Sequence, residues 1–167
     1  MKRRAAIASA LAACLSGCGR SPATAGRPQW PELAVTQFDG RPITLPAASP
    51  QPRVVNLWAL WCPPCRAELP ALERLGLVLA PRGVEVSAIA LAEDVFPVRE
   101  YLARYAARLP GAVLSPQQPV VQQLGVDSLP QTFIVARDGG VLACWVGARE
   151  WDSPKVRAEL DRVLKDA

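Results

Sequence analysis

Two cysteines separated by two prolines, Cys62 and Cys65, are the residues of this chain whose types and spacing point most directly to chemistry. Two thiols at this spacing can cycle between a dithiol and a disulfide. The apolar residues 54–60 before them are typical of a buried strand, and residues 66–80 are typical of a helix. A thiol at a helix N-terminus loses its proton more easily, and the thiolate is the nucleophile. The pair therefore predicts a redox site.

Two other uses of the pair fit the sequence less well. A structural zinc site takes four ligands, but this chain has no histidine and, beyond its N-terminal segment, only Cys144 as a third thiol. An inert disulfide at this spacing would close too short a loop to stabilise the fold much. We therefore expect no metal and no cofactor. Cys144 stands alone in a predicted strand, where a small buried side chain is expected.

The N-terminus has the features of an export signal. Residues 2–4 are basic, and residues 5–15 form an apolar run that is too short to span a bilayer, which takes about 20 residues. Residues 15–18, LSGC, resemble a bacterial lipobox, in which Cys18 becomes the lipidated first residue of the mature chain. Cys14 fits a similar pattern, but Cys18 follows a longer apolar run and precedes a polar segment. An ordinary cleaved signal is the alternative.

Composition divides the chain into three parts. We expect a lipoprotein signal peptide at residues 1–18, a flexible tether at 19–31 and one folded domain at 32–167. Without residues 1–18 the chain keeps 16 basic and 15 acidic residues, so no basic stripe suggests nucleic acid. Export places the cysteine pair where disulfides persist. A useful dithiol there needs electrons from an outside donor.

Hydrophobic periodicity and turn residues predict a mixed α/β domain. The predicted strands are residues 33–38, 43–45, 53–60, 84–91, 112–114, 131–136 and 141–146, and the predicted helices are residues 66–80, 96–108, 119–124 and 154–165. The turn residues Asp39-Gly40 and the run at 138–140 each indicate a β-hairpin. This order of elements predicts a mixed central sheet with helices on both faces.

Two segments resemble the signatures of a known family. Residues 54–75, VVNLWALWCPPCRAELPALERL, are similar to the signature of the TlpA/ResA-like thiol–disulfide oxidoreductases of the bacterial periplasm, which have a thioredoxin fold. Residues 129–133, LPQTF, match their second signature, a loop with a cis-proline. The likeness covers roughly residues 33–165. It implies a thioredoxin-like fold with an N-terminal β-hairpin and a strand–helix insertion between Cys65 and Pro130.

The resemblance also implies roles for single residues. Cys62 is expected to be the exposed attacking thiol, Cys65 the resolving thiol and Pro130 the cis-proline that faces them. Glu68 lies where ResA-like proteins place an acid that tunes the pair, and it shares a helix face with Cys65. An ordinary surface acid is the alternative for Glu68. Asn56 stands where plain thioredoxin has a buried Asp. Four residues are expected to contact the client: Trp61, Pro63, Leu129 and Pro130.

The favoured function is a monomeric, lipid-anchored disulfide reductase on the periplasmic side of a bacterial membrane. Its clients would be exported proteins with disulfides, such as apocytochrome c or copper-delivery proteins, and a transmembrane thiol-electron donor would recharge it. Pro64 directly before Cys65, as in reducing members of the fold, favours this direction. A disulfide oxidase or isomerase of the same fold is the nearest alternative. A copper carrier or a docking module without catalysis is another, although the mature chain lacks His and Met.

Overall fold

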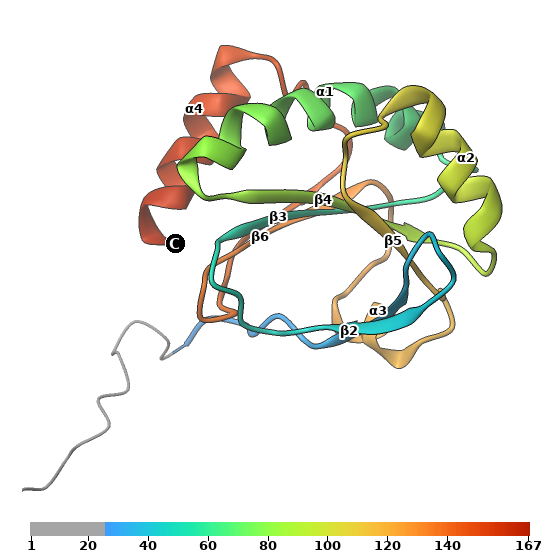
Figure 1. Cartoon of the computed structure of the whole chain (residues 1–167). Coiled ribbons are helices and arrows are strands. Elements are labelled where there is room, and N and C mark those ends of the chain that lie inside the picture. The colour runs from blue at the N-terminus through green and yellow to red at the C-terminus, as the bar shows by residue number, and fades with distance from the viewer. Residues whose placement is uncertain (1–25) are drawn as a thin grey trace, which may run out of the picture.

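A mixed seven-stranded sheet forms the centre of the computed structural model, which describes residues 26–167 (Figure 1). The strands are β1 (Leu33–Thr36), β2 (Pro42–Leu45), β3 (Arg53–Trp58), β4 (Glu85–Leu91), β5 (Gly111–Leu114), β6 (Gln131–Val135) and β7 (Val141–Val146). The helices are α1 (Pro63–Leu79), α2 (Val95–Tyr105), α3 (Pro119–Gln123) and α4 (Pro154–Val163), with 3-10 turns η2 (Ala80–Arg82) and η3 (Leu164–Asp166). The order of strands and α-helices along the chain is the predicted one. The proposed signal peptide and its lipidation residue lie outside the described residues.

The strands lie side by side in the order β2-β1-β5-β4-β3-β6-β7. Strands β3, β4 and β5 are parallel, whereas β6 runs antiparallel to β3, and β1 runs antiparallel to β5. Every residue of β3 is buried, as its continuous apolar sequence predicts. The pairing of Leu57 with Gln131 places the start of β6 beside the end of β3. This register brings Pro130 to the end of the sheet from which the chain continues to Cys62.

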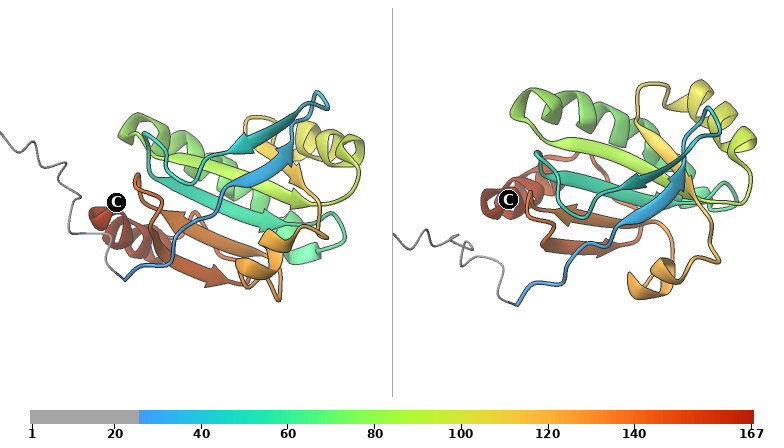
Figure 2. Two further views of the ribbon diagram at one scale, coloured as in Figure 1. Left: turned by 90° about the horizontal axis from the view of Figure 1, so that it is seen from below. Right: turned by 60° about the horizontal axis from the view of Figure 1, so that its bottom comes forward.

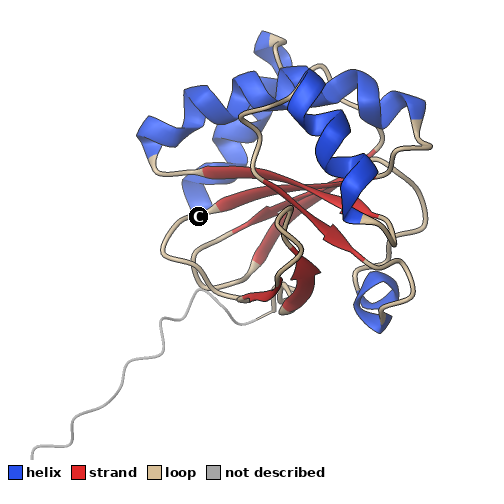
Figure 3. Ribbon diagram, turned by 45° about the vertical axis from the view of Figure 1, so that its right-hand side comes forward, coloured by secondary structure: helices blue, strands red, loops and turns tan. Residues whose placement is uncertain are grey.

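The two faces of the sheet are covered differently. Helices α1, α2 and α4 lie over one face of the sheet. The short α3 lies on the other face, and the sheet curls so that its β1–β2 edge also lies on that side (Figures 1 and 3). Alternate residues of β3 therefore enter two cores: Val54 and Trp58 pack with the helices, and Leu57 packs with the hairpin side. By the same alternation Asn56 faces the helices. The fold is the predicted thioredoxin-like one, and the interval between Cys65 and Pro130 contains β4, α2, β5 and α3 after the end of α1.

The folded domain begins before residue 32. Trp30 is only 1% exposed and packs edge-on against Phe133, with ring centroids 5.1 Å apart. The Trp30 N–H donates to the Gly139 carbonyl at 2.8 Å, and the Val141 N–H donates to the Pro28 carbonyl at 2.8 Å. The end of the predicted tether is therefore part of the domain, because a buried indole and paired backbone groups hold it. Seen from below, this segment crosses the sheet face opposite α1 (Figure 2).

Local sequence signals set the helix boundaries. Helix α1 begins at Pro63, ahead of the helical run at residues 66–80, because a proline is tolerated at the first helical position, where its missing N–H would have no partner. Helix α2 ends at Tyr105, because Ala106 adopts φ −153° and ψ 57°, outside the helical region. Within residues 26–167, no helix is both long and apolar enough to cross a membrane.

Candidate active site

A disulfide between Cys62 and Cys65 lies at the start of α1, with their Cα atoms 5.3 Å apart. Cys62 is the N-cap residue of this helix: its backbone is extended, and its Sγ accepts a hydrogen bond from the Cys65 N–H at 3.3 Å. Pro63 and Pro64 follow as the first two helical residues. The helix start thus presents N–H donors and the positive end of its dipole to the sulfur of Cys62, which favours a thiolate there after reduction.

The two cysteines differ in accessibility less than predicted. Cys62 is 3% exposed and Cys65 is fully buried, so the exposed position predicted for Cys62 is not observed in the disulfide form. The reason is local, since the Cys62 sulfur turns inward over the helix start and is bonded to the buried Cys65. Cys62 is still the more accessible of the two. Trp61, directly before it, is 75% exposed.

The loop before β6 carries the predicted cis-proline. The Leu129–Pro130 peptide bond is cis, and the Pro130 carbonyl accepts a hydrogen bond from the Gly147 N–H at 2.8 Å. Leu129 is half-buried and packs against the core cluster that contains both cysteines. Of the residues predicted to contact a client, Trp61 and Pro63 are therefore exposed, Leu129 is half-buried and Pro130 is buried.

The carboxylate of Glu68 is buried one helical turn beyond Cys65. The side chain is 5% exposed, so the alternative of an ordinary surface acid is wrong. Its Oε1 accepts a hydrogen bond from Asn56 Nδ2 at 2.8 Å. Its Oε2 accepts two more, from the Arg149 backbone N–H at 2.8 Å and from Trp151 Nε1 at 3.0 Å. Residues three apart on a helix lie on one face, so this acid and Cys65 are neighbours.

Burial dominates the electrostatics of this acid. Removal from water raises the pKa of the Glu68 carboxyl, because the charged form loses its hydration. The hydrogen bonds from Arg149, Asn56 and Trp151 and the positive charge of Arg149 act in the opposite direction, but the pKa stays above its ordinary value. A carboxyl group with a raised pKa can take up and release a proton closer to neutral pH.

Asn56 links this acid to the strand that follows the cis-proline. Its Nδ2 donates both to Glu68 Oε1 and to Thr132 Oγ1, the latter at 2.9 Å. Its Oδ1 is buried and has no hydrogen-bond partner in the described part of the chain. A neutral amide thus occupies the position of the buried Asp of plain thioredoxin, and Glu68 provides the buried negative charge instead.

Arg149 and Trp151 are contacts of the site that the sequence did not reveal. They belong to the loop between β7 and α4, about 80 residues after Glu68. The one available signal was chemical, because a buried indole N–H usually needs an acceptor. The Arg149 guanidinium lies 3.9 Å from the ring centroid of Trp145 and pairs with Glu159 at 2.8 Å, and both contacts hold the loop in place.

The prediction of a buried Cys144 is wrong. Its side chain is exposed, and Gln131 Nε2 donates to its Sγ at 3.1 Å. Cys144 is on the edge strand β7, where it pairs with Phe133 and so shares the sheet face opposite α1. Helix α3 and the β1–β2 hairpin, which are on that face, lie over other strands than β7, so the Cys144 thiol reaches solvent.

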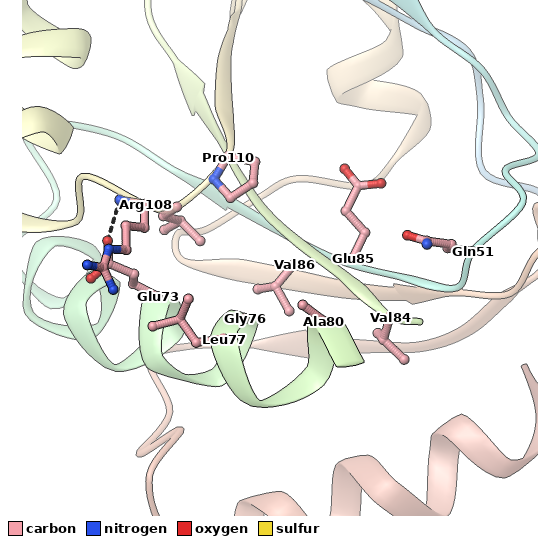
Figure 4. Close-up of a pocket in the computed structure, with 11 residues that line it drawn as sticks. Gln51, Glu73, Gly76, Leu77, Ala80, Val84, Glu85, Val86, Arg108 and Pro110 are labelled. Carbon is pink, nitrogen blue, oxygen red and sulfur yellow. Dashed lines mark hydrogen bonds between the residues drawn. The ribbon is translucent and has the colours of Figure 1, made fainter. Parts of the chain in front are cut away.

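One of the hollows beside α1 touches the site. A groove of about 440 Å³ lies between α1 and the loop before α4, and Glu68, Pro64 and Trp151 line it. A pocket of about 290 Å³ lies at the opposite end of α1, beside Gly76 and the start of β4 (Figure 4). Among residues 26–167, no three His, Cys, Asp or Glu side chains are grouped so that they could hold a metal ion.

Known proteins are similar to this chain in sequence and fold. Residues 27–143 match the AhpC/TSA family. The chain is 29% identical over 117 residues to the thiol-disulfide oxidoreductase ResA of Bacillus anthracis, which covers 70% of this chain and 67% of the relative. A solved thiol:disulfide interchange protein of the thioredoxin family from Chlorobium tepidum is 26% identical, with a TM-score of 0.65 over 83% of this chain and 94% of that one.

A third likeness concerns the fold alone. The pneumococcal exposed lipoprotein thioredoxin Etrx1 of Streptococcus pneumoniae is 19% identical, with a TM-score of 0.63 over 80% of this chain and 98% of that one. The cysteine pair at the helix start, the cis-proline and the more similar relatives all indicate thiol–disulfide exchange. The chain belongs to the AhpC/TSA family and is a thiol–disulfide oxidoreductase with a thioredoxin-like fold.

Proposed function

We propose that this protein reduces disulfides in exported client proteins through Cys62 and Cys65. The observation that carries the direction is the buried Glu68 carboxylate one turn beyond Cys65. A strong disulfide oxidant is one whose reduced form is stabilised. A buried negative charge next to the pair acts the other way, because it opposes formation of a thiolate. The pair should therefore give up its electrons more readily.

The reaction consists of two thiol–disulfide exchanges. The Cys62 thiolate attacks one sulfur of the client disulfide, which forms a mixed disulfide and releases the other client sulfur as a thiolate that takes up a proton. The Cys65 thiol then loses its proton and attacks Cys62, which releases the second client thiol and leaves the Cys62–Cys65 disulfide. Two electrons pass to the client. Glu68, which is buried one helical turn beyond Cys65, is the proposed acceptor of the Cys65 proton.

The proposed client segment is extended and binds the surface around Cys62. We propose that its backbone lies beside the Leu129–Pro130 loop, where main-chain hydrogen bonds bind many sequences. The exposed Trp61 and Pro63 would contact its side chains. Apocytochrome c and copper-site assembly proteins are the proposed clients, and a transmembrane thiol-electron donor is the proposed source of electrons. A monomer without cofactor stays a prediction.

Lipidation at Cys18 would hold the domain at the periplasmic side of the membrane. The basic start, the short apolar run and the LSGC sequence support it. A relative in fold, the pneumococcal Etrx1, is an exposed lipoprotein. Residues 19–26 would connect the lipidated cysteine to the segment that packs on the domain.

The roles of the two cysteines can be separated by serine substitutions. Cys62→Ser should lower the rate of reduction of a small peptide disulfide at least 100-fold, because the attacking atom is lost. Cys65→Ser should instead accumulate a mixed disulfide at Cys62, visible by mass spectrometry of the non-reduced protein. Cys144→Ser is the control and should react like the wild type. Faster alkylation of Cys65 than of Cys62 in the reduced protein at neutral pH would reverse the assignment.

The raised pKa of Glu68 makes stability depend on pH. An acid whose pKa is higher in the folded state stabilises the fold below its ordinary pKa of 4.5, and this contribution is lost as the pH rises through the raised value. Relative to Glu68→Gln, the oxidised wild type should therefore lose about 1.4 kcal/mol for every unit by which the folded-state pKa exceeds the unfolded one. Urea unfolding between pH 4 and 8 measures this difference.

The chain offers a clean background for that measurement. It has no histidine, and the disulfide removes the two site thiols from the titration. Free energies of unfolding that run parallel in the two proteins over this pH range would show that burial does not perturb the acid.

The standard potential of the Cys62–Cys65 couple tests the direction of electron flow. We expect a value more negative than about −180 mV, the potential of protein disulfide isomerase. Glu68→Gln should make it less negative, because the reduced form is no longer opposed by a nearby carboxylate. Equilibration with glutathione buffers, followed by alkylation and mass spectrometry, gives the value. A potential near −120 mV, typical of a strong periplasmic oxidant, would instead support the oxidase alternative.

Membrane attachment is tested with the full-length chain in a bacterial host. The wild type should sediment with membranes and carry acyl chains on Cys18, because the lipobox cysteine becomes the modified first residue. Cys18→Ala should abolish acylation, whereas Cys14→Ala should leave it unchanged. An unacylated mature protein, or a mature N-terminus at Cys14 in the mass spectrum, would reject the assignment.

A further inference from the structure

The two oxygens of Glu68 have chemically different partners. Its Oε2 accepts from the Arg149 backbone N–H and from Trp151 Nε1, and neither group can accept a proton. A proton on Oε2 would therefore face two donors. Its Oε1 instead faces the Asn56 side-chain amide, which has a donor end and an acceptor end.

The indole of Trp151 is held firmly in this position. The side chain is fully buried and packs against Trp145, with ring centroids 6.0 Å apart. Its backbone carbonyl accepts from Arg157 Nε at 3.2 Å, and its backbone N–H donates to the Arg149 carbonyl at 3.1 Å. The ring cannot turn away from the carboxylate without disturbing this part of the core.

We propose that Trp151 is a positioning residue of the redox site, which engages Oε2 of Glu68 and so directs the exchangeable proton of this acid to Oε1. The proposal rests on the proposed use of Glu68 as the proton acceptor for Cys65. It adds an assignment of which oxygen exchanges the proton, and it gives a redox role to a residue from the loop before α4.

Asn56 can turn its amide to suit either form of the acid, whereas Trp151 can only donate to Oε2. In the ionised form Asn56 Nδ2 donates to Glu68 and Thr132, and Asn56 Oδ1 has no partner in the described structure. If Oε1 is protonated, a half-turn of the amide lets Oδ1 accept both the new O–H and the Thr132 hydroxyl. An indole N–H only donates, so it stabilises the ionised acid more than the neutral one. Removal of the indole N–H should therefore favour the protonated acid.

Few other groups that titrate or carry charge surround Glu68. From α1 these are Cys62 and Cys65, which are silent in the oxidised protein. From the loop before α4 these are the Arg149 guanidinium, which is paired with Glu159, and the carboxylates of Glu150 and Asp152, which line the same groove as Glu68. Asp152 is paired with Arg74 and Arg157. Strands β3 and β6 contribute neutral groups, the Asn56 amide and the Thr132 hydroxyl. Comparison with Glu68→Gln separates the titration of these groups from that of Glu68.

The test follows the Glu68 carboxyl directly, by NMR of the oxidised protein with ¹³C-labelled glutamate. Glu68→Gln identifies the signal by removing it. Trp151→Phe keeps most of the ring but removes the N–H, and it should raise the pKa of Glu68 by about one unit. Trp30→Phe is the matched control, since it shortens a buried indole in the core on the other face of the sheet without touching Arg149 or the acid, and it should leave this pKa within a few tenths.

A second readout uses the reduced protein. The pH profile of Cys62 alkylation should move when Trp151→Phe is introduced into the wild type, and it should stay in place when the same change is made in the Glu68→Gln background. An equal movement in both backgrounds, or an equal pKa shift in Trp30→Phe, would show that Trp151 acts only through packing and would overturn the proposal.

Wild-type protein gives a test that does not depend on the folding of Trp151→Phe. The Nε1–H resonance of Trp151 should follow the titration of Glu68, with the same midpoint, and should stay constant in Glu68→Gln. A Trp151 resonance that ignores the ionisation of Glu68 would overturn the proposal. These measurements concern the acid alone, so they stand even if the potential of the couple contradicts a reductase.

Discussion

The burial of one carboxylate under the disulfide is the constraint on which the site depends. A buried charge is costly unless it is hydrogen-bonded. The Glu68 carboxylate receives its hydrogen bonds only when three parts of the chain pack together. Helix α1 provides the acid, β3 provides Asn56, and the loop before α4 provides Arg149 and Trp151. The same contacts that let the acid fold into the core also decide how readily it takes a proton. Stability and redox tuning are therefore two consequences of one arrangement.

The sheet register places the remaining parts of the site at one end of the molecule. Strand β3 leads to Cys62, and the antiparallel β6 begins beside its end, immediately after Pro130. The described N-terminal segment joins the domain at the β6–β7 turn, through the hydrogen bond of Trp30 to Gly139, which is at the other end of these strands. The chain from the proposed lipid anchor would thus join the domain at the end opposite the cysteine pair. The end with the cysteine pair would stay accessible to clients.

Local signals made much of the fold predictable from the sequence. The order of elements follows from hydrophobic runs and turn residues, and the cysteine pair and cis-proline follow from two short segments. The sequence could not show that Glu68 is buried by donors about 80 residues away, because such contacts depend on how α1 and the loop before α4 pack. Composition placed residues 19–31 in a tether, but Trp30 within that range is buried against Phe133 of β6. Cys144 was expected to be buried, but an edge strand leaves one of its faces uncovered.

The most direct test of the account compares the titration of Glu68 in the oxidised and the reduced forms of one wild-type sample. If the acid and the cysteine pair act as one proton-sharing set, reduction should move and broaden the Glu68 titration curve, because the thiols then exchange protons with the acid. The oxidised form should show a single titration above the ordinary range of a glutamate. Superimposable curves in the two redox states would contradict the account, since the buried acid would then be a structural group without influence on the disulfide.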